Sequence, residues 1–356
     1  MEQTLTHGGD WAGYEARYGG APLDFSANIS PLGLPEGVRS AVIRSLAQAE
    51  RYPDPLCRAL GGAVAQAEGV DPGWVLCGNG AADLIYRVVL AKRPRRALVT
   101  APAFSEYEAA LDLVRCQTDR FALREEDEFG LGEGFLEAVG PETDMVFLCQ
   151  PNNPTGRTVP RPLLTAVLER CRSVNALLVV DECFCDFLDD PGGFTMTGLL
   201  GKYGNLLILK AFTKLYAMAG LRLGYCLCSD RVLLDAMRDA GQPWAVSGPA
   251  QAAGIAALGE TEYVRAVRAL IAQERPRLAD ELSRLGLRVV PGEANYLLFY
   301  SPTPLIQPLR ERGILLRDCG NYHGLCDGWY RAAVRTGEEN DRLTAALEEI
   351  LKEGAP

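Results

Sequence analysis

The stretch LKAFTKLYAMAGLRLGY, residues 209–225, decides the fold because charged side chains follow directly on an apolar run. The residues NLLILKAF, 205–212, suit a buried strand, and Lys214 comes just after it, with Arg222 eight residues later. Lysine is seldom fully buried without a partner. The small residues and glycines around it let backbone approach another group closely. A surface lysine in a loop between two strands is the alternative from this stretch alone.

Apolar strand-like runs alternate with helical segments on the N-terminal side of this stretch. The strand-like runs are residues 74–80, 96–102, 144–151, 176–182 and 205–212, and the helical segments are 81–93, 104–115 and 162–173. Short apolar runs separated by helices of ten or more residues are typical of a mostly parallel sheet covered on both faces. The sequence therefore predicts an α/β fold.

The pattern changes in the C-terminal part of the chain. A long helical stretch, residues 251–286, leads into strand-like segments and a final helix from Glu338. We therefore expect a large domain over residues 31–245. A smaller α+β domain is expected from residues 1–30 together with 246–356. Clefts between packed domains are favoured ligand sites.

Charge and composition exclude several classes of partner. Lys+Arg number 36 against 46 Asp+Glu, a net charge of −10, which argues against nucleic acid or an anionic membrane as the main partner. No run has the length of a membrane span, and the N-terminus lacks the apolar core of a signal peptide. The 11 cysteines are therefore expected to be reduced in the cytoplasm. Cys319, His323 and Cys326 lie close in sequence, but their spacing fits no strong zinc pattern, so no metal is expected.

Three other segments place unusual residues where strands end. CGNGAAD, 77–83, turns from a strand into a helix on glycines, and the N–H groups of a helix N-terminus suit a phosphate. CQPNNPTG, 149–156, holds Asn153 between prolines that restrict the chain. VVDE, 179–182, ends an apolar strand with Asp181, a carboxylate that needs a cationic or N–H partner there. Each of these segments alone is compatible with an ordinary turn.

Taken in order, these segments and residues 209–225 resemble the fold-type I pyridoxal 5'-phosphate enzymes, the aspartate aminotransferase superfamily. The resemblance runs nearly end to end and implies a mostly parallel seven-stranded sheet with flanking helices. It implies that Lys214 binds the cofactor covalently and that Asp181 keeps the ring nitrogen protonated. A buried amine near Arg222 is pushed toward its neutral, nucleophilic form, which explains the charged end of the apolar run.

The same resemblance implies further cofactor contacts. Asn153 is expected to bind the ring 3-oxygen, and Phe104 in APAFSEY is expected to stack on the ring. The cofactor phosphate is expected to take the backbone N–H groups and side chains of Gly80, Ala81, Ala82, Thr213 and Arg222. Tyr52 in RYPDP resembles a tyrosine that reaches the phosphate from a second subunit, which implies a homodimer.

Two positions depart from the family pattern. Ala211 stands where many members have Ser, which removes a phosphate hydroxyl. Phe184 stands where many members have Tyr, which leaves the 3-oxygen to Asn153. Both departures bear on how tightly the cofactor is held.

Within the superfamily the chain resembles the threonine-phosphate decarboxylases of cobalamin synthesis and the histidinol-phosphate aminotransferases. THGGD, 6–10, and DFSANISPLG, 24–33, favour the decarboxylase branch. So does YRAAVRTGEEN, 330–340, with two arginines available to a dianionic substrate. A small phosphorylated amino acid is thus the expected substrate, bound by His7, Gly8, Gly9, Asn28, Asn153, Arg331 and Arg335.

Alternatives remain open at the level of sequence. His7 in a terminal tail and Arg335 in a surface ion pair are the structural alternatives for those residues. Histidinol-phosphate aminotransferase is the main alternative activity. A serine-phosphate decarboxylase and a non-catalytic regulator that binds pyridoxal phosphate are the others.

Overall fold

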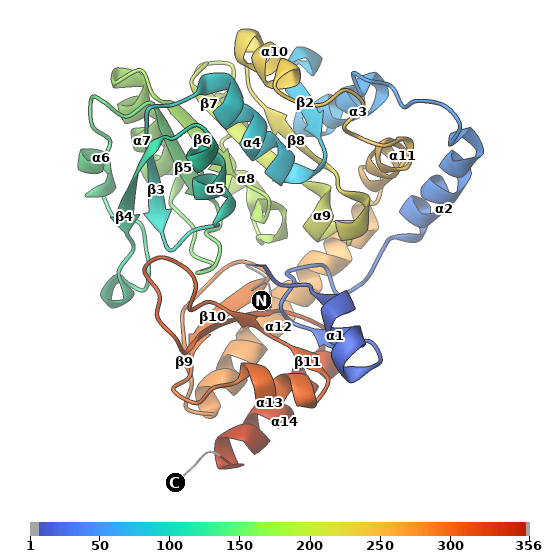
Figure 1. The fold of residues 1–356 in the computed structure, drawn as a ribbon, viewed down its shortest axis with the longest axis vertical. Helices are drawn as coiled ribbons and strands as arrows, with labels where there is room; N and C mark the ends of the chain where they lie inside the picture. Colours follow the sequence, from blue (N-terminus) through green and yellow to red (C-terminus); the bar gives the residue numbers. More distant parts are fainter. Residues whose placement is uncertain (1–6, 354–356) are drawn as a thin grey trace.

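The computed structural model describes residues 7–353 and contains a seven-stranded sheet and a four-stranded sheet (Figure 1). In the larger sheet β8 runs antiparallel to both neighbours and the other pairs are parallel. This confirms the predicted mostly parallel, seven-stranded sheet. Its strands in spatial order are β2 (Val75–Gly78), β8 (Gly224–Leu227), β7 (Leu206–Ala211), β6 (Leu177–Asp181), β5 (Met145–Cys149), β3 (Arg96–Ala101) and β4 (Gln117–Ala122).

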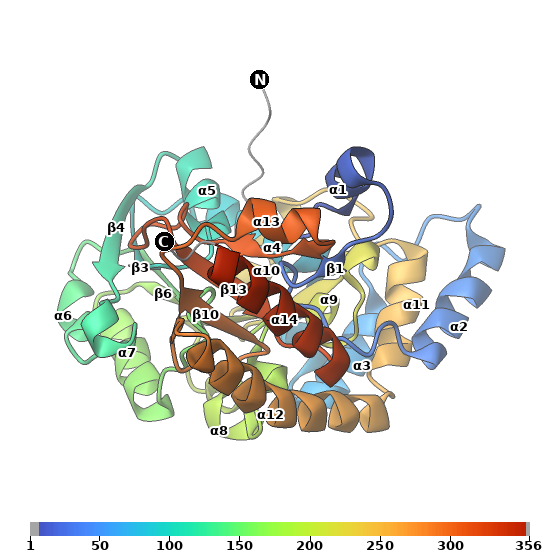
Figure 2. The ribbon, with the colours of Figure 1, turned by 90° about the horizontal axis from the view of Figure 1, so that it is seen from below.

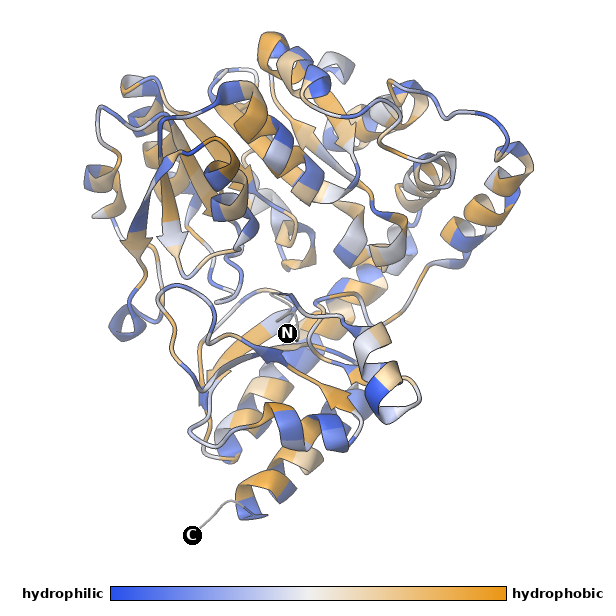
Figure 3. Ribbon diagram, viewed as in Figure 1, coloured by the Kyte–Doolittle hydropathy of each residue, from blue (hydrophilic) through white to orange (hydrophobic). Residues whose placement is uncertain are grey.

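Both faces of the larger sheet are buried, which explains the continuous apolar runs of its central strands. Successive side chains of a strand point to opposite faces, and Figure 3 colours these strands as largely hydrophobic. One face packs on α4 (Gly80–Lys92), α5 (Glu106–Leu113) and α10 (Arg231–Asp239). The other packs on α3 (Arg58–Glu68), α7 (Arg161–Ser173) and α11 (Gly248–Ala257).

The four-stranded sheet is antiparallel and is built mainly from the C-terminal part of the chain. Its order is β12 (Arg317–Asp318), β13 (Trp329–Ala333), β10 (Tyr296–Tyr300) and β9 (Arg288–Val289). It shares a core with α12 (Thr261–Arg284), α13 (Ile306–Glu311) and α14 (Gly337–Glu353), the first and last of which are prominent in Figure 2. The N-terminal part of the chain joins this unit, because β1 (Leu23–Asp24) pairs with β11 (Ile314–Leu315).

The long helical stretch expected over 251–286 is two helices, so that expectation was wrong. α11 ends at Ala257 and α12 begins at Thr261, with Gly259 in the connection. α11 packs on α2 (Glu36–Ser45) and α3, whereas α12 packs in the core of the smaller sheet. The division into two domains at residues 30 and 245 stays a prediction.

Strands β4 and β8 were not recognised in the sequence. β4 is polar and only partly buried, and β8 has four residues that follow directly on the charged loop. β4 lacks the apolar–polar alternation on which a strand prediction depends, and β8 is too short to show one. Among residues 7–353, no helix combines the length and the apolar character that a membrane crossing requires.

Candidate active site

The carboxyl ends of three parallel strands meet at one edge of the larger sheet. In the register, Cys149 of β5 lies opposite Asp181 of β6, which lies opposite Leu209 of β7. Asn153 and Lys214 follow the ends of β5 and β7. Ligand sites of α/β sheets form at this edge. A cavity of about 530 Å³ lies there, and β12 and β13 of the smaller sheet complete its wall.

Most of the predicted site residues line this cavity. They are His7, Gly8, Asn28, Ala81, Ala82, Phe104, Asn153, Asp181, Thr213, Lys214, Arg222 and Arg331. Phe184 and Ala211, the two departures from the family pattern, line it as well. The fold thus brings loops from five strands of the larger sheet together with the N-terminal segment and the smaller sheet.

Asp181 is a buried carboxylate held by two donors. The alternation of β6 turns it toward the face covered by α4 and α5, where the Tyr107 hydroxyl donates to its Oδ2 at 2.7 Å. The Cys183 N–H donates to Oδ1 at 3.0 Å. Burial, together with the Asp181 charge, raises the pKa of Tyr107 well above its ordinary value, so this hydroxyl keeps its proton. Asp181 is therefore oriented and ready to accept one more hydrogen bond from a cation in the cavity.

Lys214 is placed on α9 (Phe212–Leu215), a single turn that follows β7. Burial lowers the pKa of its amine to about 8, and the charges of Arg331 and Arg222 act in the same direction. Such an amine has a much larger neutral fraction near neutral pH than an exposed lysine has. A neutral amine is a nucleophile toward carbonyl groups, so Lys214 can form a covalent bond with an aldehyde.

The N-terminus of α4 offers an anion site. The side chain of its N-cap residue, Asn79, does not cap the first turn, so these N–H groups are left for another acceptor. Ala81 and Ala82 face the cavity there. Gly80 has φ +82°, and a Cβ on it would lie 2.7 Å from Nη2 of Arg222. Glycine at this position thus lets the Arg222 guanidinium lie directly against the helix start.

Asn28 is a buried polar side chain without a partner among residues 7–353. It is 2% exposed and lines the cavity, yet neither its Oδ1 nor its Nδ2 makes a hydrogen bond. A buried amide without partners costs about 1–3 kcal/mol. This arrangement indicates that a polar group bound in the cavity completes the hydrogen bonds of Asn28.

Two arginines lie side by side on the smaller sheet. Arg317 of β12 is the cross-strand partner of Arg331 of β13, and both line the cavity. Arg331 donates to Asn153 Oδ1 and, at 2.9 Å, to the carbonyl of Ser26. Arg317 donates to Asn321 at 2.9 Å. The sequence prediction missed Arg317, because only the register of two short strands brings it beside Arg331.

Besides Gly80, whose neighbours Ala81 and Ala82 line the cavity, three predicted residues lie outside the cavity lining. Arg335 donates to Glu339 at 2.7 Å and to the carbonyl of Asp24 at 3.1 Å, and it lies outside the cavity wall. The N–H of Gly9 is used by Ser26 Oγ at 2.8 Å. Tyr52 is 79% exposed and stacks on Trp244 away from the cavity of its own chain. Arg335 thus forms an ion pair with Glu339, which is the structural alternative that the sequence left open.

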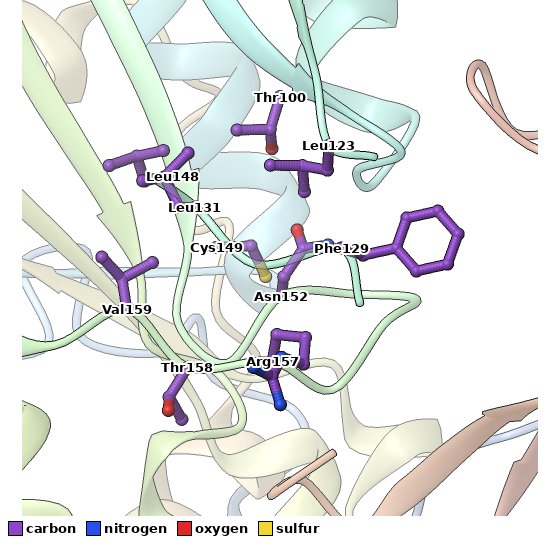
Figure 4. A pocket seen from close by; sticks show the side chains of 10 residues that line it. All are labelled: Thr100, Leu123, Phe129, Leu131, Leu148, Cys149, Asn152, Arg157, Thr158 and Val159. Carbon is purple, nitrogen blue, oxygen red and sulfur yellow. The ribbon is translucent and has the colours of Figure 1, made fainter. Parts of the chain in front are cut away.

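A much smaller cavity lies beside Asn152 and shares Cys149 with the larger one. Figure 4 shows Thr100 and Leu123 on one side of it and Arg157 on the other. Its volume of about 10 Å³ suits a single water molecule. It is far too small for a cofactor, so the chemistry belongs to the larger cavity.

The cysteines and histidine of CGNYHGLC do not gather. Cys319 is buried, whereas the side chain of His323 is 64% exposed and Cys326 is exposed. In the described part of the chain, no three His, Cys, Asp or Glu side chains are arranged to hold a metal ion.

Comparisons with known proteins agree with this fold. Residues 21–348 match the model of the family "Aminotransferase class I and II". The threonine-phosphate decarboxylase of Salmonella typhimurium is 41% identical over 338 residues, which cover 94% of this chain and 92% of that protein. The histidinol-phosphate aminotransferase of Symbiobacterium thermophilum is 36% identical, with 93% and 91% covered.

A solved structure shows the same fold. The histidinol-phosphate aminotransferase of Sinorhizobium meliloti, in complex with pyridoxal 5'-phosphate, has a TM-score of 0.88 against this chain at 24% identity. The match covers 99% of this chain and 97% of that one.

Fold and site together define a pyridoxal phosphate enzyme of fold type I. The chain belongs to the aminotransferase class I and II family, and its cofactor is pyridoxal 5'-phosphate. The residues present fit that group: Lys214 for the aldehyde, Asp181 for the ring nitrogen, and the N–H groups at the start of α4 for the phosphate.

Proposed function

We propose that this chain decarboxylates L-threonine O-3-phosphate to (R)-1-amino-2-propanol O-2-phosphate, a step in building the cobalamin nucleotide loop. The observation that carries the proposal is the cationic wall of the cavity. Four Lys and Arg side chains line it against two carboxylates, and Arg317 and Arg331 lie next to each other. A substrate with both a carboxylate and a phosphate suits such a pair. The 41% identity to a threonine-phosphate decarboxylase supports the same substrate.

Each end of the cofactor has residues to hold it. Lys214 takes the aldehyde, Asp181 the ring nitrogen and Asn153 the 3-oxygen, while Phe104 stacks on the ring. Arg222, Thr213 and the N–H groups of Ala81 and Ala82 take the phosphate. Tyr107 and Cys183 keep Asp181 oriented through their hydrogen bonds to its two oxygens.

The protein chooses the reaction through orientation. When bound, pyridoxal phosphate supplies a flat ring that takes up electrons from whichever substrate Cα bond stands perpendicular to it. Arg317, Arg331 and the N-terminal segment bind the substrate's anionic groups and so set its rotation about Cα. We assign this task to Arg317 in place of Arg335, whose guanidinium is engaged by Glu339. A substrate held in this way would present its carboxylate as the group that leaves, as CO₂.

Lys214 completes the reaction by moving a proton. After CO₂ has left, the Cα carbon needs a proton before the product amine is released. The Lys214 amine lies in the cavity and titrates near pH 8, so it can carry this proton.

A homodimer forms part of the proposal. Tyr52 is exposed next to a surface concavity of about 920 Å³ that Trp244 and Ile255 also line. All three side chains are more than two-fifths exposed, which is unusual for large apolar groups gathered at one place. We assign this surface to the second subunit, with Tyr52 reaching the partner's cofactor phosphate.

Histidinol-phosphate aminotransferase is the second candidate, favoured by the 36% identity to a relative of that name. Its substrate is also an amino compound with a phosphate, so the same arginines would bind it. Serine phosphate differs from threonine phosphate by one methyl group, which is worth about 1–3 kcal/mol in a pocket.

Incubation of the purified holoenzyme with L-threonine phosphate tests the proposal. We expect release of CO₂ in equal amount with the amine phosphate, and no release with Lys214→Ala. Serine phosphate is run in parallel to define the preferred substrate. If threonine phosphate yields no CO₂ but histidinol phosphate is transaminated with 2-oxoglutarate, the aminotransferase is the activity. A protein that turns over none of these substrates fits the regulator.

A further inference from the structure

The segment CGNYHGLC, residues 319–326, lies in the loop between β12 and β13, the two strands that carry the cavity arginines. Its backbone forms two successive turns that share Tyr322. The Tyr322 N–H donates to the Cys319 carbonyl at 3.1 Å, and the Tyr322 carbonyl accepts from the Leu325 N–H at 3.1 Å. The Tyr322 side chain lines the cavity. The loop therefore holds this ring at a defined place in the cavity wall.

The same loop contacts the larger sheet. Gly324 has φ +87°, and a Cβ on it would lie 3.1 Å from the carbonyl oxygen of Ala101, the last residue of β3. Cys319, at the start of the loop, is buried in an apolar cluster with Leu123, which follows β4. The loop thus bridges the two sheets beside the cavity. Side chains that it holds have a fixed place relative to the residues at the strand ends of the larger sheet.

Arg331 is held by an amide oxygen and an aromatic ring. It donates to Asn153 Oδ1, and its guanidinium carbon lies 5.3 Å from the centre of the Tyr296 ring. The Tyr296 hydroxyl in turn donates to the carbonyl of Asn152 at 2.9 Å. A cation over an aromatic face is attracted by the electrons of the ring. Both partners are neutral, so they orient the guanidinium without cancelling its charge.

Arg317 has the same two kinds of partner, and both come from the loop. Asn321 Oδ1 accepts from Arg317 Nη2 at 2.9 Å, and the guanidinium carbon lies 5.3 Å from the centre of the Tyr322 ring. Burial raises the pKa of Tyr322 above its ordinary value of 10.0, although the Arg331 charge opposes the shift, so this partner is neutral too. Arg317 and Arg331 are cross-strand neighbours, and like charges at such positions repel. The position of Arg317 therefore depends on what holds it from the loop.

We propose that Tyr322, together with Asn321, is a positioning residue that fixes Arg317 relative to Arg331, so that the cavity selects ligands with two anionic groups. The ligand class is a short molecule with a carboxylate at one end and a phosphate or phosphonate at the other. The inference rests on the proposed function for the identity of the substrate within that class. Two guanidinium groups at a fixed spacing favour a matching pair of anions, because no ordering is needed on binding. A mobile Arg317 would lose that preference.

Binding of unreactive anions to the holoenzyme, measured by calorimetry, tests the inference. 3-Phosphonopropionate has a carboxylate and a phosphonate but no amine, so it cannot react with the cofactor. The wild type should bind it more tightly than it binds methylphosphonate or propionate. Tyr322→Leu should weaken its binding about fivefold to tenfold and that of the two single anions by less than about twofold. Tyr322→Phe keeps the ring face and should restore the affinity of the wild type.

Tyr300→Leu is the matched control. Arg288 lies over the Tyr300 ring at 5.0 Å, and Tyr300 packs on the same apolar cluster as Tyr322, but it is outside the cavity lining. Its substitution should change anion binding by less than about twofold. In an Arg317→Gln background, Tyr322→Leu should cause no further loss, because the ring acts through Arg317.

Asn321→Ala changes an exposed residue and removes the other contact, so it should also weaken binding of 3-phosphonopropionate. It decides the question if Tyr322→Leu does not fold. The inference is overturned if the decisive variant binds as the wild type does, if Tyr322→Phe is as weak as Tyr322→Leu, or if the loss adds in full to that of Arg317→Gln. A wild type without preference for the two-headed anion overturns it as well.

Steady-state kinetics connect the inference with turnover. With threonine phosphate, Tyr322→Leu should raise KM with a smaller change in kcat, and Tyr322→Phe should restore KM. Absence of CO₂ release, with the effects on anion binding intact, would overturn the proposed function alone.

Discussion

At the scale of single residues, the cavity works through charges whose neighbours set their state. Lys214 has a pKa near 8 because burial and two arginines disfavour its ammonium form. Arg331 is one of these two arginines, and it also donates a hydrogen bond to Asn153. The cation that we propose binds an anionic substrate therefore also increases the neutral fraction of the Lys214 amine, and the two properties can be separated by substitution.

Arg331→Gln should raise the pKa of Lys214 toward its ordinary value of 10.5, because one of the charges that lowers it is removed. Recombination of the cofactor-free protein with pyridoxal phosphate needs the neutral amine, so its rate in wild type should rise as pH passes through about 8. In the variant the rise should come at higher pH. Absorbance of the bound cofactor, followed over time at a series of pH values, measures the recombination rate of the wild type and of the variant. An unchanged profile would show that Arg331 does not act on Lys214.

Arg317 and Arg335 offer a matched comparison. Arg317→Gln removes a charged hydrogen-bond donor from the cavity, which costs about 1.5–3 kcal/mol of substrate binding, or on the order of tenfold to a hundredfold in KM. Arg335→Gln should change KM by less than about threefold, because Arg335 is bound by Glu339 outside the cavity. Steady-state kinetics with threonine phosphate distinguish them. The opposite order would restore Arg335 to the substrate site.

At the scale of elements, two junctions position the residues of the site. They are the turn from β2 into α4 and the ends of β6 and β7. The first depends on Gly80 at φ +82°. The second has ionic contacts on the face opposite the cofactor cavity. There Lys210 pairs with Glu68 at 2.9 Å and Asp186 at 3.3 Å, next to the fully buried Glu182.

Gly80→Ala should weaken cofactor binding while leaving the fold intact. The new Cβ would meet Arg222 Nη2 at 2.7 Å, and alanine at positive φ costs about 1 kcal/mol or more. Arg222 must then move away from the start of α4. We expect about a tenfold rise in the dissociation constant of pyridoxal phosphate, measured by titration of the cofactor-free protein. Gly61→Ala is the control, because a Cβ there meets no atom within 4 Å.

Glu182→Gln should make the protein less sensitive to alkaline pH. Burial raises the pKa of Glu182 to about 7, from 4.5, although the charge of Lys210 opposes the shift. The folded state thus binds a proton that the unfolded state has released. This stability is fully present below about pH 4.5 and is lost as pH rises through 7, by at most about 1.4 kcal/mol per pH unit. The glutamine Oε1 can still accept from Met196 N, while its Nε2 can donate to Thr195 Oγ1.

Urea denaturation of wild type and Glu182→Gln at pH 5.5 and pH 8 checks this. The wild type should lose more stability between the two values than the variant. Equal losses would mean that Glu182 titrates in the folded state as it does in the unfolded chain.

At the scale of the whole molecule, the proposed dimer places Tyr52 beside a second subunit's cofactor. Ile255→Asp should disrupt it, because a charge replaces an exposed apolar side chain in the concavity that the partner would bury. We expect a monomer by sedimentation, with cofactor affinity reduced about tenfold or more.

Val232→Asp is the control for this prediction. Val232 is 80% exposed on α10, outside the concavity, so its substitution should leave the assembly unchanged. A wild-type protein that is monomeric and fully active would contradict the role of Tyr52.

The sequence by itself determined the parallel sheet and the residues at its strand ends. The apolar runs before Asp181 and Lys214 are local signals, because a strand buried on both faces must be apolar throughout. A charged residue at the end of such a strand is therefore easy to recognise. The motif order around Asn153, Asp181, Lys214 and Arg222 needed no tertiary information. The fold, the family and the cofactor followed from these, and the comparisons confirm them.

Only the tertiary structure decided which charges face the cavity from the smaller sheet and the N-terminal segment. Arg317 joins Arg331 through the pairing of β12 with β13, while Arg335, four residues beyond Arg331, is bound by Glu339. Glu106 meets His7 across 99 residues of chain. Such contacts depend on strand register and on how distant segments pack, which leave no periodic trace in the sequence. A local pattern can place a charge at the end of a strand, but the partner of that charge is set by the fold.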